Sequence, residues 1–177
     1  MQMNLPNKLT IFRVLMIPVF IIVLMTGIIP EPQNRYLAVV VFCIASFTDY
    51  LDGYIARKYN LVTNFGKFMD PLADKLLVAA ALICMVEMEF LSAWIVVIII
   101  SREFIITGFR LIAVESGIVI AASWWGKIKT ASQMAMIIVV LLGIWPIIGN
   151  ILIILSTIFT VISGVDYILK NIKVLKI

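Results

Sequence analysis

Long apolar runs recur along this chain, and they constrain its fold more than any other feature. A helix needs roughly 20 apolar residues to cross a bilayer. Runs of about that length are found at Ile11–Ile29, Tyr36–Arg57, Asp70–Met88, Leu91–Glu115, Lys127–Ile144 and Ile147–Leu169. Because 63% of the residues are hydrophobic and only 14% are charged, the composition excludes a soluble globular domain. We therefore predict an all-α, polytopic membrane protein with six transmembrane helices.

The spans leave no room for a separate soluble domain, so residues 1–177 are expected to form a single membrane domain. The segment Asn4–Thr10 is short and amphipathic, and it is predicted to form an interfacial helix on the membrane surface before the first span. The first apolar run lacks a small-residue cleavage site, which favours a retained helix over a signal peptide. Pro30 and Pro32 after that run, and Pro146 before the last, support these boundaries.

Positive charge is divided unevenly between the two sides of the membrane that six spans define. Of the 14 Lys and Arg residues, only Arg35 falls on the side away from the termini. By the positive-inside rule, the side with the other basic residues is cytoplasmic. We therefore expect an integral protein of a bacterial-type cytoplasmic membrane, with both termini on the cytoplasmic side. The net charge of +4 is a topology signal, and no nucleic acid partner is expected.

Histidine is absent, and the two cysteines, Cys43 and Cys84, lie inside apolar runs. A role as small core residues is predicted for both, rather than a disulfide or a metal pair. Trp124 and Trp125 are predicted to be interfacial anchors, because tryptophan is enriched at membrane–water boundaries. Without an imidazole base, any acid–base chemistry must fall to carboxylates.

Four aspartates are the strongest functional signal in the chain: Asp49, Asp52, Asp70 and Asp74. The first two share one helix face and the last two share another, because residues three or four apart are neighbours on a helix. A carboxylate near a bilayer costs a few kcal/mol, so four of them need a compensating partner. Oxygen ligands without sulfur or imidazole suit hard cations such as Mg²⁺ or Mn²⁺. The spacing predicts a metal site on the cytoplasmic side, with Gly53 and Gly66 allowing close approach.

Each of these residues also has a purely structural alternative. Asp70 precedes Pro71 and could serve only as a helix N-cap. The first pair of aspartates could form structural ion pairs with Arg57 or Lys58, and the two glycines could serve only close helix packing. At the level of the whole protein, a divalent-cation transporter is an alternative, because intramembrane carboxylates also mark ion pathways. A purely structural membrane subunit is another.

The stretch from Asp49 to Asp74 contains D-Y-L-D-G-Y-I-A-R, a gap of eight residues, and then G-K-F-M-D-P-L-A-D. It resembles the signature of the CDP-alcohol phosphotransferase family, D-x2-D-G-x2-A-R-x8-G-x3-D-x3-D. The fixed positions are matched by Asp49, Asp52, Gly53, Ala56, Arg57, Gly66, Asp70 and Asp74. Three further segments, Asn4–Arg13, Ser101–Arg110 and Gly126–Met134, resemble the phosphatidylglycerophosphate synthase branch of that family.

The resemblance implies a membrane-embedded, homodimeric enzyme that transfers a phosphatidyl group from CDP-diacylglycerol to an alcohol and releases CMP. For this branch it implies sn-glycerol 3-phosphate as the acceptor and phosphatidylglycerol phosphate as the product. Sister enzymes that use inositol phosphate, serine or phosphatidylglycerol share the aspartate signature, so another acceptor stays open. The expected partners are therefore both substrates and membrane lipid, and the expected cofactors are two divalent ions, Mg²⁺ or Mn²⁺.

The resemblance also implies roles within the site. The expected metal ligands are Asp49, Asp52, Asp70 and Asp74. Asp74 is also expected to be the catalytic base that takes the proton of the glycerol hydroxyl. Nucleotide contacts are expected at Gly53, Ala56, Arg57, Gly66, Asn7, Thr10 and Arg13.

The second substrate of that reaction carries a phosphate and needs cationic donors. Glu103, Thr107 and Arg110 recur at helical spacing on one stripe of the fourth span. The expected phosphate contacts are Arg110, Thr107, Arg102, Lys127 and Lys129. The alternative for Arg102 and the two lysines is that they only set topology or reach lipid headgroups.

Overall fold

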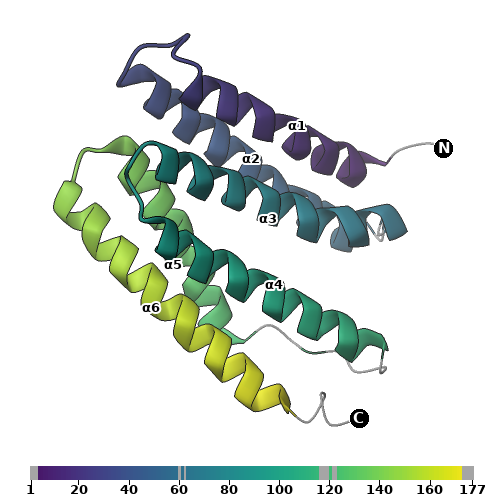
Figure 1. The fold of residues 1–177 in the computed structure, drawn as a ribbon. Coiled ribbons are helices and arrows are strands. Elements are labelled where there is room, and N and C mark those ends of the chain that lie inside the picture. Colours follow the sequence, from purple (N-terminus) through teal and green to yellow (C-terminus); the bar gives the residue numbers. More distant parts are fainter. Residues whose placement is uncertain (1–3, 60, 62, 116–119, 121–122, 173–177) are drawn as a thin grey trace. The chain divides into compact units, whose positions relative to one another are not determined.

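The computed structural model describes residues 4–59, 61, 63–115, 120 and 123–172, and every regular element in these ranges is helical. The helices are α1 (Leu5–Met25), α2 (Gln33–Lys58), α3 (Asn64–Glu87), α4 (Ala93–Glu115), α5 (Trp124–Leu142) and α6 (Pro146–Asn171) (Figure 1). Each predicted span corresponds to one of these helices. The predicted all-α fold is therefore confirmed.

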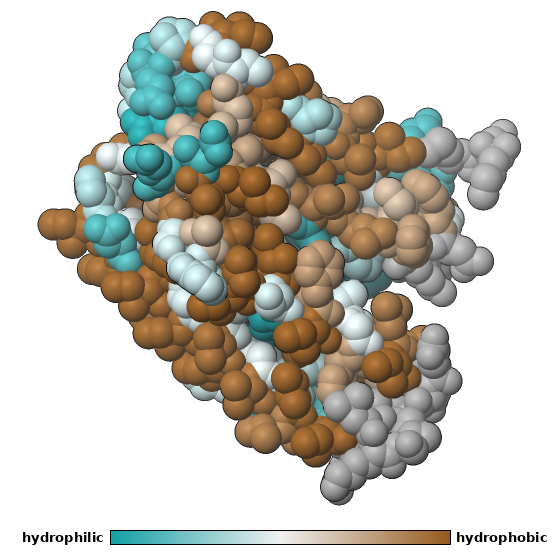
Figure 2. All heavy atoms as spheres, viewed as in Figure 1, coloured by the Kyte–Doolittle hydropathy of each residue, from teal (hydrophilic) through white to brown (hydrophobic). Residues whose placement is uncertain are grey.

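Four helices, α1, α2, α5 and α6, are long and apolar enough to cross a membrane. The apolar runs of α3 and α4 are interrupted by charged residues, among them Asp74 in α3 and Glu103 in α4. Large apolar side chains are exposed along the helices, as at Trp94 and Ile147. Figure 2 shows hydrophobic residues over much of the visible face. Such faces suit a hydrocarbon environment. The chain is thus a polytopic membrane protein, and crossing by α3 and α4 stays a prediction.

The helices fall into two compact units, Met1–Met88 and Glu89–Ile177. In the first unit α1 packs against both α2 and α3, and in the second unit α6 packs against α4 and α5. Phe20 and Phe42 pack in the first core with ring centroids 6.2 Å apart. Phe109 and Tyr167 pack edge to face in the second, 6.0 Å apart. The expected single domain over residues 1–177 stays a prediction.

The amino-terminal segment differs from its prediction. Asn4–Thr10 does not form a separate surface helix, because residues from Leu5 onward are the first turns of α1. The Asn4 side chain caps the helix by accepting a hydrogen bond from the Asn7 backbone N–H at 3.1 Å. Pro6 in the first turn needs no N–H partner there. Nothing in the sequence therefore stops the helix before it enters the apolar run.

The start of α3 also differs from its prediction. The helix begins at Asn64, and Thr63 caps it by accepting a hydrogen bond from the Gly66 N–H at 3.0 Å. Pro71 consequently lies inside the helix, and Asp70 is not an N-cap. A residue before proline is disfavoured in helical conformation, which is why the sequence suggested a boundary there. Membrane helices tolerate such a proline where neighbouring groups satisfy the freed carbonyl.

Candidate active site

One arginine of α1 holds two carboxylates of α2. Arg13 contacts Asp49 Oδ1 through Nη1 at 2.7 Å, and it contacts Asp52 Oδ2 through Nη2. The Arg13 side chain has 0% exposed surface and the Asp52 side chain 2%, whereas Asp49 is 42% exposed. Buried charges persist only when they are paired. The arginine therefore fixes the end of α2 against α1 and leaves part of Asp49 accessible to a ligand.

The same stripe of α1 also reaches α3. Thr10 lies one helical turn before Arg13 and is fully buried, and its Oγ1 donates a hydrogen bond to Asp70 Oδ1 at 2.6 Å. Asn7, another turn earlier, accepts a hydrogen bond from Thr63 Oγ1 at 2.8 Å. Residues three apart share a helix face, so Asn7, Thr10 and Arg13 together tie α1 to both neighbouring helices.

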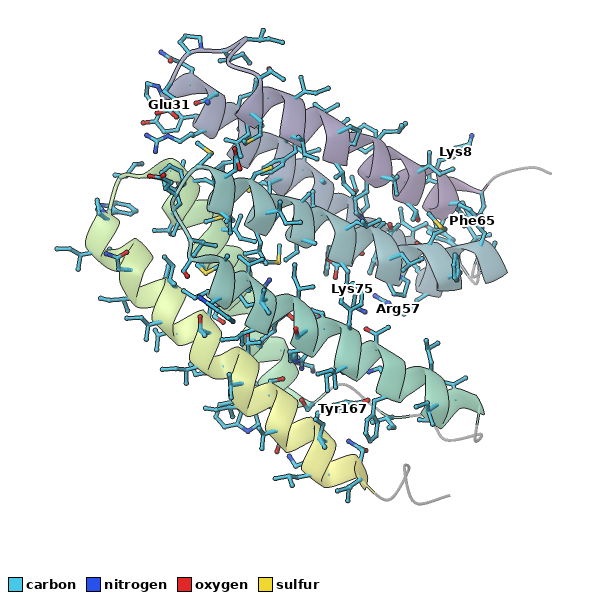
Figure 3. The ribbon with its side chains drawn as sticks, viewed as in Figure 1. Lys8, Glu31, Arg57, Phe65, Lys75 and Tyr167 are labelled. Carbon is cyan, nitrogen blue, oxygen red and sulfur yellow. The ribbon has the colours of Figure 1, made fainter. Side chains whose placement is uncertain are left out.

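Three of the four signature aspartates lie close to one another. Asp70 is near enough to Asp49 and Asp52 for its charge to act on both. Asp74 lies one turn further along α3, with its side chain exposed. Figure 3 shows Lys8, Arg57 and Lys75 toward this end of the first unit and Glu31 at the opposite end. Asp70 of α3 thus lies near both α2 carboxylates, and residues of α1 hold all three. Convergence of all four aspartates on one metal site stays a prediction.

A pocket of about 240 Å³ opens beside these carboxylates. It is lined by Pro6, Asn7, Gly53, Ala56, Arg57, Leu61, Thr63, Gly66 and Asp70. A Cβ added at Gly66 would lie 3.3 Å from Asn7 Oδ1 and 3.4 Å from Asp70 Oδ2. Glycine at this position therefore keeps the polar wall of the pocket open.

The residues expected to contact a nucleotide divide into two groups. Five of them line this pocket: Asn7, Gly53, Ala56, Arg57 and Gly66. Thr10 and Arg13 are buried instead and hold the aspartates. Sequence analysis missed the pairing of Arg13, although a lone arginine in an apolar run signals an acidic partner. It also missed Thr63, whose signal is a threonine at the start of a helix.

The α2 aspartates form ion pairs with Arg13 of α1, rather than the structural pairs with Arg57 or Lys58 that the sequence left open. Lys58 lies instead over the rings of Tyr54 and Tyr59, 5.4 and 5.6 Å from their centroids. Arg57 is close enough to act electrostatically on Asp49, and its guanidinium lies at the pocket beside Gly53.

The donor set is carboxylate oxygen, which suits a hard divalent cation. Within the described ranges, no three acidic or cysteine side chains are grouped so that they could hold a metal ion as they stand. Arg13 and Thr10 engage oxygens of Asp49, Asp52 and Asp70. The carboxylate oxygens thus suit a metal ion chemically, although several of them are engaged by Arg13 and Thr10. Metal coordination by these aspartates stays a prediction, and it requires their side chains to turn.

A second charged cluster lies within the second unit. Glu103 Oε1 on α4 accepts hydrogen bonds from Lys129 Nζ of α5 at 2.5 Å and from Arg102 Nη1 at 2.9 Å. Arg102 Nη2 also donates to Ser163 Oγ of α6 at 2.5 Å. Two of the expected phosphate contacts, Arg102 and Lys129, are thus brought together by one carboxylate.

The other expected phosphate contacts lie around this cluster in different settings. Thr107 Oγ1 donates to the Glu103 backbone carbonyl at 2.7 Å. Arg110 is exposed and packs on Tyr167, with its Nε donating to the Tyr167 hydroxyl at 3.2 Å. Lys127 is exposed at the start of α5. Sequence analysis missed Ser163, whose signal is the buried polar stripe of Ser156, Thr160 and Ser163 on α6.

Each unit thus places a cluster of charged side chains on its apolar helices. Residues 3–162 match the CDP-alcohol phosphatidyltransferase family, and the chain belongs to it. The chain is 45% identical, over 98% of its length and 97% of the relative's, to the CDP-diacylglycerol–glycerol-3-phosphate 3-phosphatidyltransferase of Bacillus subtilis. It is 46% identical to the Haemophilus influenzae protein of that name, over 76% of this chain and 73% of the relative. A probable phosphatidylglycerophosphate synthase of Mycobacterium tuberculosis is 38% identical, over 96% of this chain and 82% of the relative.

Proposed function

We propose that this enzyme transfers the phosphatidyl group of CDP-diacylglycerol to sn-glycerol 3-phosphate, giving phosphatidylglycerol phosphate and CMP. The observation that carries the proposal is the nearly full-length similarity to a relative named for this reaction. The aspartate signature supports it, because five of its eight fixed residues line one pocket, Asp70 among them. Donor and acceptor are both anionic, which suits the basic side chains found in each unit.

The donor is assigned to the first unit. Its nucleotide occupies the pocket lined by Asn7, Gly53 and Gly66, with the Arg57 guanidinium available to a phosphate. Two divalent ions, Mg²⁺ or Mn²⁺, held by the four signature aspartates, would neutralise the pyrophosphate and polarise the phosphorus under attack. Arg13 forms ion pairs with Asp49 and Asp52 and so holds both carboxylates at this end of α2.

Asp74 is assigned as the general base. An oxygen–phosphorus bond forms between the glycerol hydroxyl and the phosphatidyl phosphorus, and the bond from that phosphorus to CMP breaks. The hydroxyl proton passes to the carboxylate of Asp74, which is exposed and therefore accessible. A positioned carboxylate can accept this proton because proximity offsets its weak basicity.

The phosphate of the acceptor is assigned to the second unit. Arg102, Lys129 and Arg110 supply charge, while Thr107 and Lys127 lie on the same two helices. Arginine forks and lysine ammonium groups both bind phosphate well. An acceptor without a phosphate would leave these cations without their ligand, which favours glycerol 3-phosphate over serine.

The proposal also covers the side of the membrane on which the enzyme acts and its oligomeric state. The active site and both termini face the cytoplasm, because the basic residues collect on that side by the positive-inside rule. The protein acts as a homodimer, which the family resemblance supports. Light scattering of the detergent-solubilised protein measures that state directly, and a monomeric mass in an active preparation would refute it.

The decisive test is an acceptor panel with purified protein. CDP-diacylglycerol is supplied with sn-glycerol 3-phosphate, inositol phosphate, serine or phosphatidylglycerol, and CMP release is followed with Mg²⁺, Mn²⁺ or chelator. We expect metal-dependent turnover with glycerol 3-phosphate above all others. Faster release with another acceptor would refute the acceptor assignment. Metal uptake into proteoliposomes without CMP formation would favour the transporter alternative.

A further inference from the structure

We propose that Glu103 is a positioning residue for the acceptor phosphate. Its carboxylate holds the side chains of Lys129 and Arg102 as a fixed pair of phosphate donors. This inference rests on the proposed function, because it deepens the acceptor site assigned to the second unit. Glu103 itself is an anion and does not contact the phosphate.

The contacts of Glu103 define this role. One oxygen, Oε1, accepts from Lys129 Nζ at 2.5 Å and from Arg102 Nη1 at 2.9 Å. The side chains of Lys129 and Arg102 are only 5% and 13% exposed, and that of Glu103 is 24% exposed. A single acidic oxygen thus links two largely buried cations from neighbouring helices of the second unit.

Arg102 is confined from its other side as well. Its Nη2 donates to Ser163 Oγ at 2.5 Å. A Cβ added at Gly164 would lie 3.2 Å from Arg102 Cγ, so the backbone of α6 packs close to the arginine stem. The guanidinium is therefore held between a carboxylate on α4 and a hydroxyl on α6, with little freedom to move.

The charge balance explains why one acid serves a phosphate site. Two cations and one carboxylate leave a net charge of +1 in the cluster, which attracts a phosphate. Without the carboxylate, the two like charges would repel each other, and Lys129 would lose its ion pair with Glu103. Donors that are already fixed before binding lose less entropy when the ligand arrives. Glu103 therefore lowers the positive potential of the cluster but fixes the positions of the two phosphate donors, Lys129 and Arg102.

Steady-state kinetics of Glu103→Gln test this role. We expect the KM for glycerol 3-phosphate to rise at least about tenfold, because hydrogen bonds to charged groups are lost. The kcat and the KM for CDP-diacylglycerol should stay within about twofold, since the donor site is untouched. The inhibition constant of inorganic phosphate, competing with glycerol 3-phosphate, should rise by the same factor.

A double-mutant cycle separates positioning from general support of the fold. In a Lys129→Met background, Glu103→Gln should raise the KM for glycerol 3-phosphate by a smaller factor than in wild type, because only the contact with Arg102 remains to be lost. The control is Asp166→Asn, which removes an ion pair of 2.7 Å with Lys170 on α6 and should leave all constants unchanged. Additive effects in the cycle, or an unchanged KM in Glu103→Gln, would overturn the inference.

Two further measurements keep the test decisive. If Glu103→Gln does not fold, Glu103→Asp keeps the charge but shortens the reach, and it must still raise the KM for glycerol 3-phosphate alone. If the wild-type protein does not use glycerol 3-phosphate, the proposed function fails. Stabilisation by inorganic phosphate, measured by thermal shift, then tests Glu103 separately. The inference requires wild type to be stabilised and Glu103→Gln not to be, so equal responses would refute it.

Discussion

Arg13 connects two of the signature aspartates, Asp49 and Asp52, to helix α1. Its guanidinium meets Asp49 and Asp52 through different nitrogens, and its side chain is fully buried. A lysine could not make both contacts in this fork geometry. Arg13 therefore supports the site through two carboxylates that the proposed mechanism needs.

Removing this arginine should weaken the fold. Arg13→Met would leave Asp52 buried without its partner, and breaking a buried pair costs about 3–5 kcal/mol. Thermal unfolding in detergent should show a clear loss of stability relative to wild type. Lys8→Met, an exposed change on the same helix, is the matched control. Equal stability of Arg13→Met and the control would contradict the role of this pair.

Asp74 should matter for chemistry rather than for folding. Its side chain is exposed on α3, so Asp74→Asn removes a charge without opening a buried gap. Loss of a general base lowers turnover by about 10²–10⁴-fold. CMP release should fall by that factor while the melting temperature stays close to wild type. Turnover within a few-fold of wild type would remove Asp74 from the mechanism.

At the scale of helices, α1 is the element that organises the donor site. Its stripe of Asn7, Thr10 and Arg13 contacts α3 through the first two residues and α2 through the third. The pocket also depends on α3 beginning before Asp70, because Thr63 and Gly66 belong to its first turn. The Thr63 cap thus fixes the position of the pocket wall that Thr63 and Gly66 form.

Gly66→Ala should obstruct the donor pocket. The added methyl would lie 3.3 Å from both Asn7 Oδ1 and Thr63 Oγ1, so these polar groups must shift. We expect a rise of several-fold in the KM for CDP-diacylglycerol. Gly108→Ala on α4 is the matched control, because a Cβ there meets nothing within 4 Å and alanine favours helix by about 0.5–1 kcal/mol. Equal KM values for the two variants would contradict this account of the pocket.

Most of the elements could be predicted from hydrophobic run length, whereas the links between them could not. Each apolar run became one helix, and the spacing of Asp49 and Asp52 placed both on one face. The spacing could not show that Arg13 would be their partner, because that contact joins residues 36 and 39 positions apart in the chain. The sequence around Pro71 predicts that α3 begins at Asp70, and this prediction is wrong because Thr63 caps the helix further upstream. Helical spacing predicts that Glu103 shares a stripe with Thr107 and Arg110, but its hydrogen bond to Lys129 depends on how α4 and α5 fold together.

At the scale of the whole molecule, the distribution of charge predicts the orientation in the membrane. Lys8 and Glu31 are both exposed, and they lie near opposite ends of the first unit (Figure 3). Cysteines can therefore be placed at these positions after Cys43 and Cys84 are replaced by alanine. A membrane-impermeant maleimide should label K8C only in inverted vesicles and E31C only in right-side-out vesicles. The opposite pattern would place the active site outside the cytoplasm.

The proposed reaction requires the signature aspartates to bind a divalent cation together with the nucleotide. The most direct measurement is Mn²⁺ binding to the purified protein in the presence of CMP, followed by electron paramagnetic resonance. We expect wild type and Asp166→Asn to bind Mn²⁺ equally, and Asp49→Asn and Asp70→Asn to lose that binding. Equal Mn²⁺ binding by all four proteins would contradict this expectation.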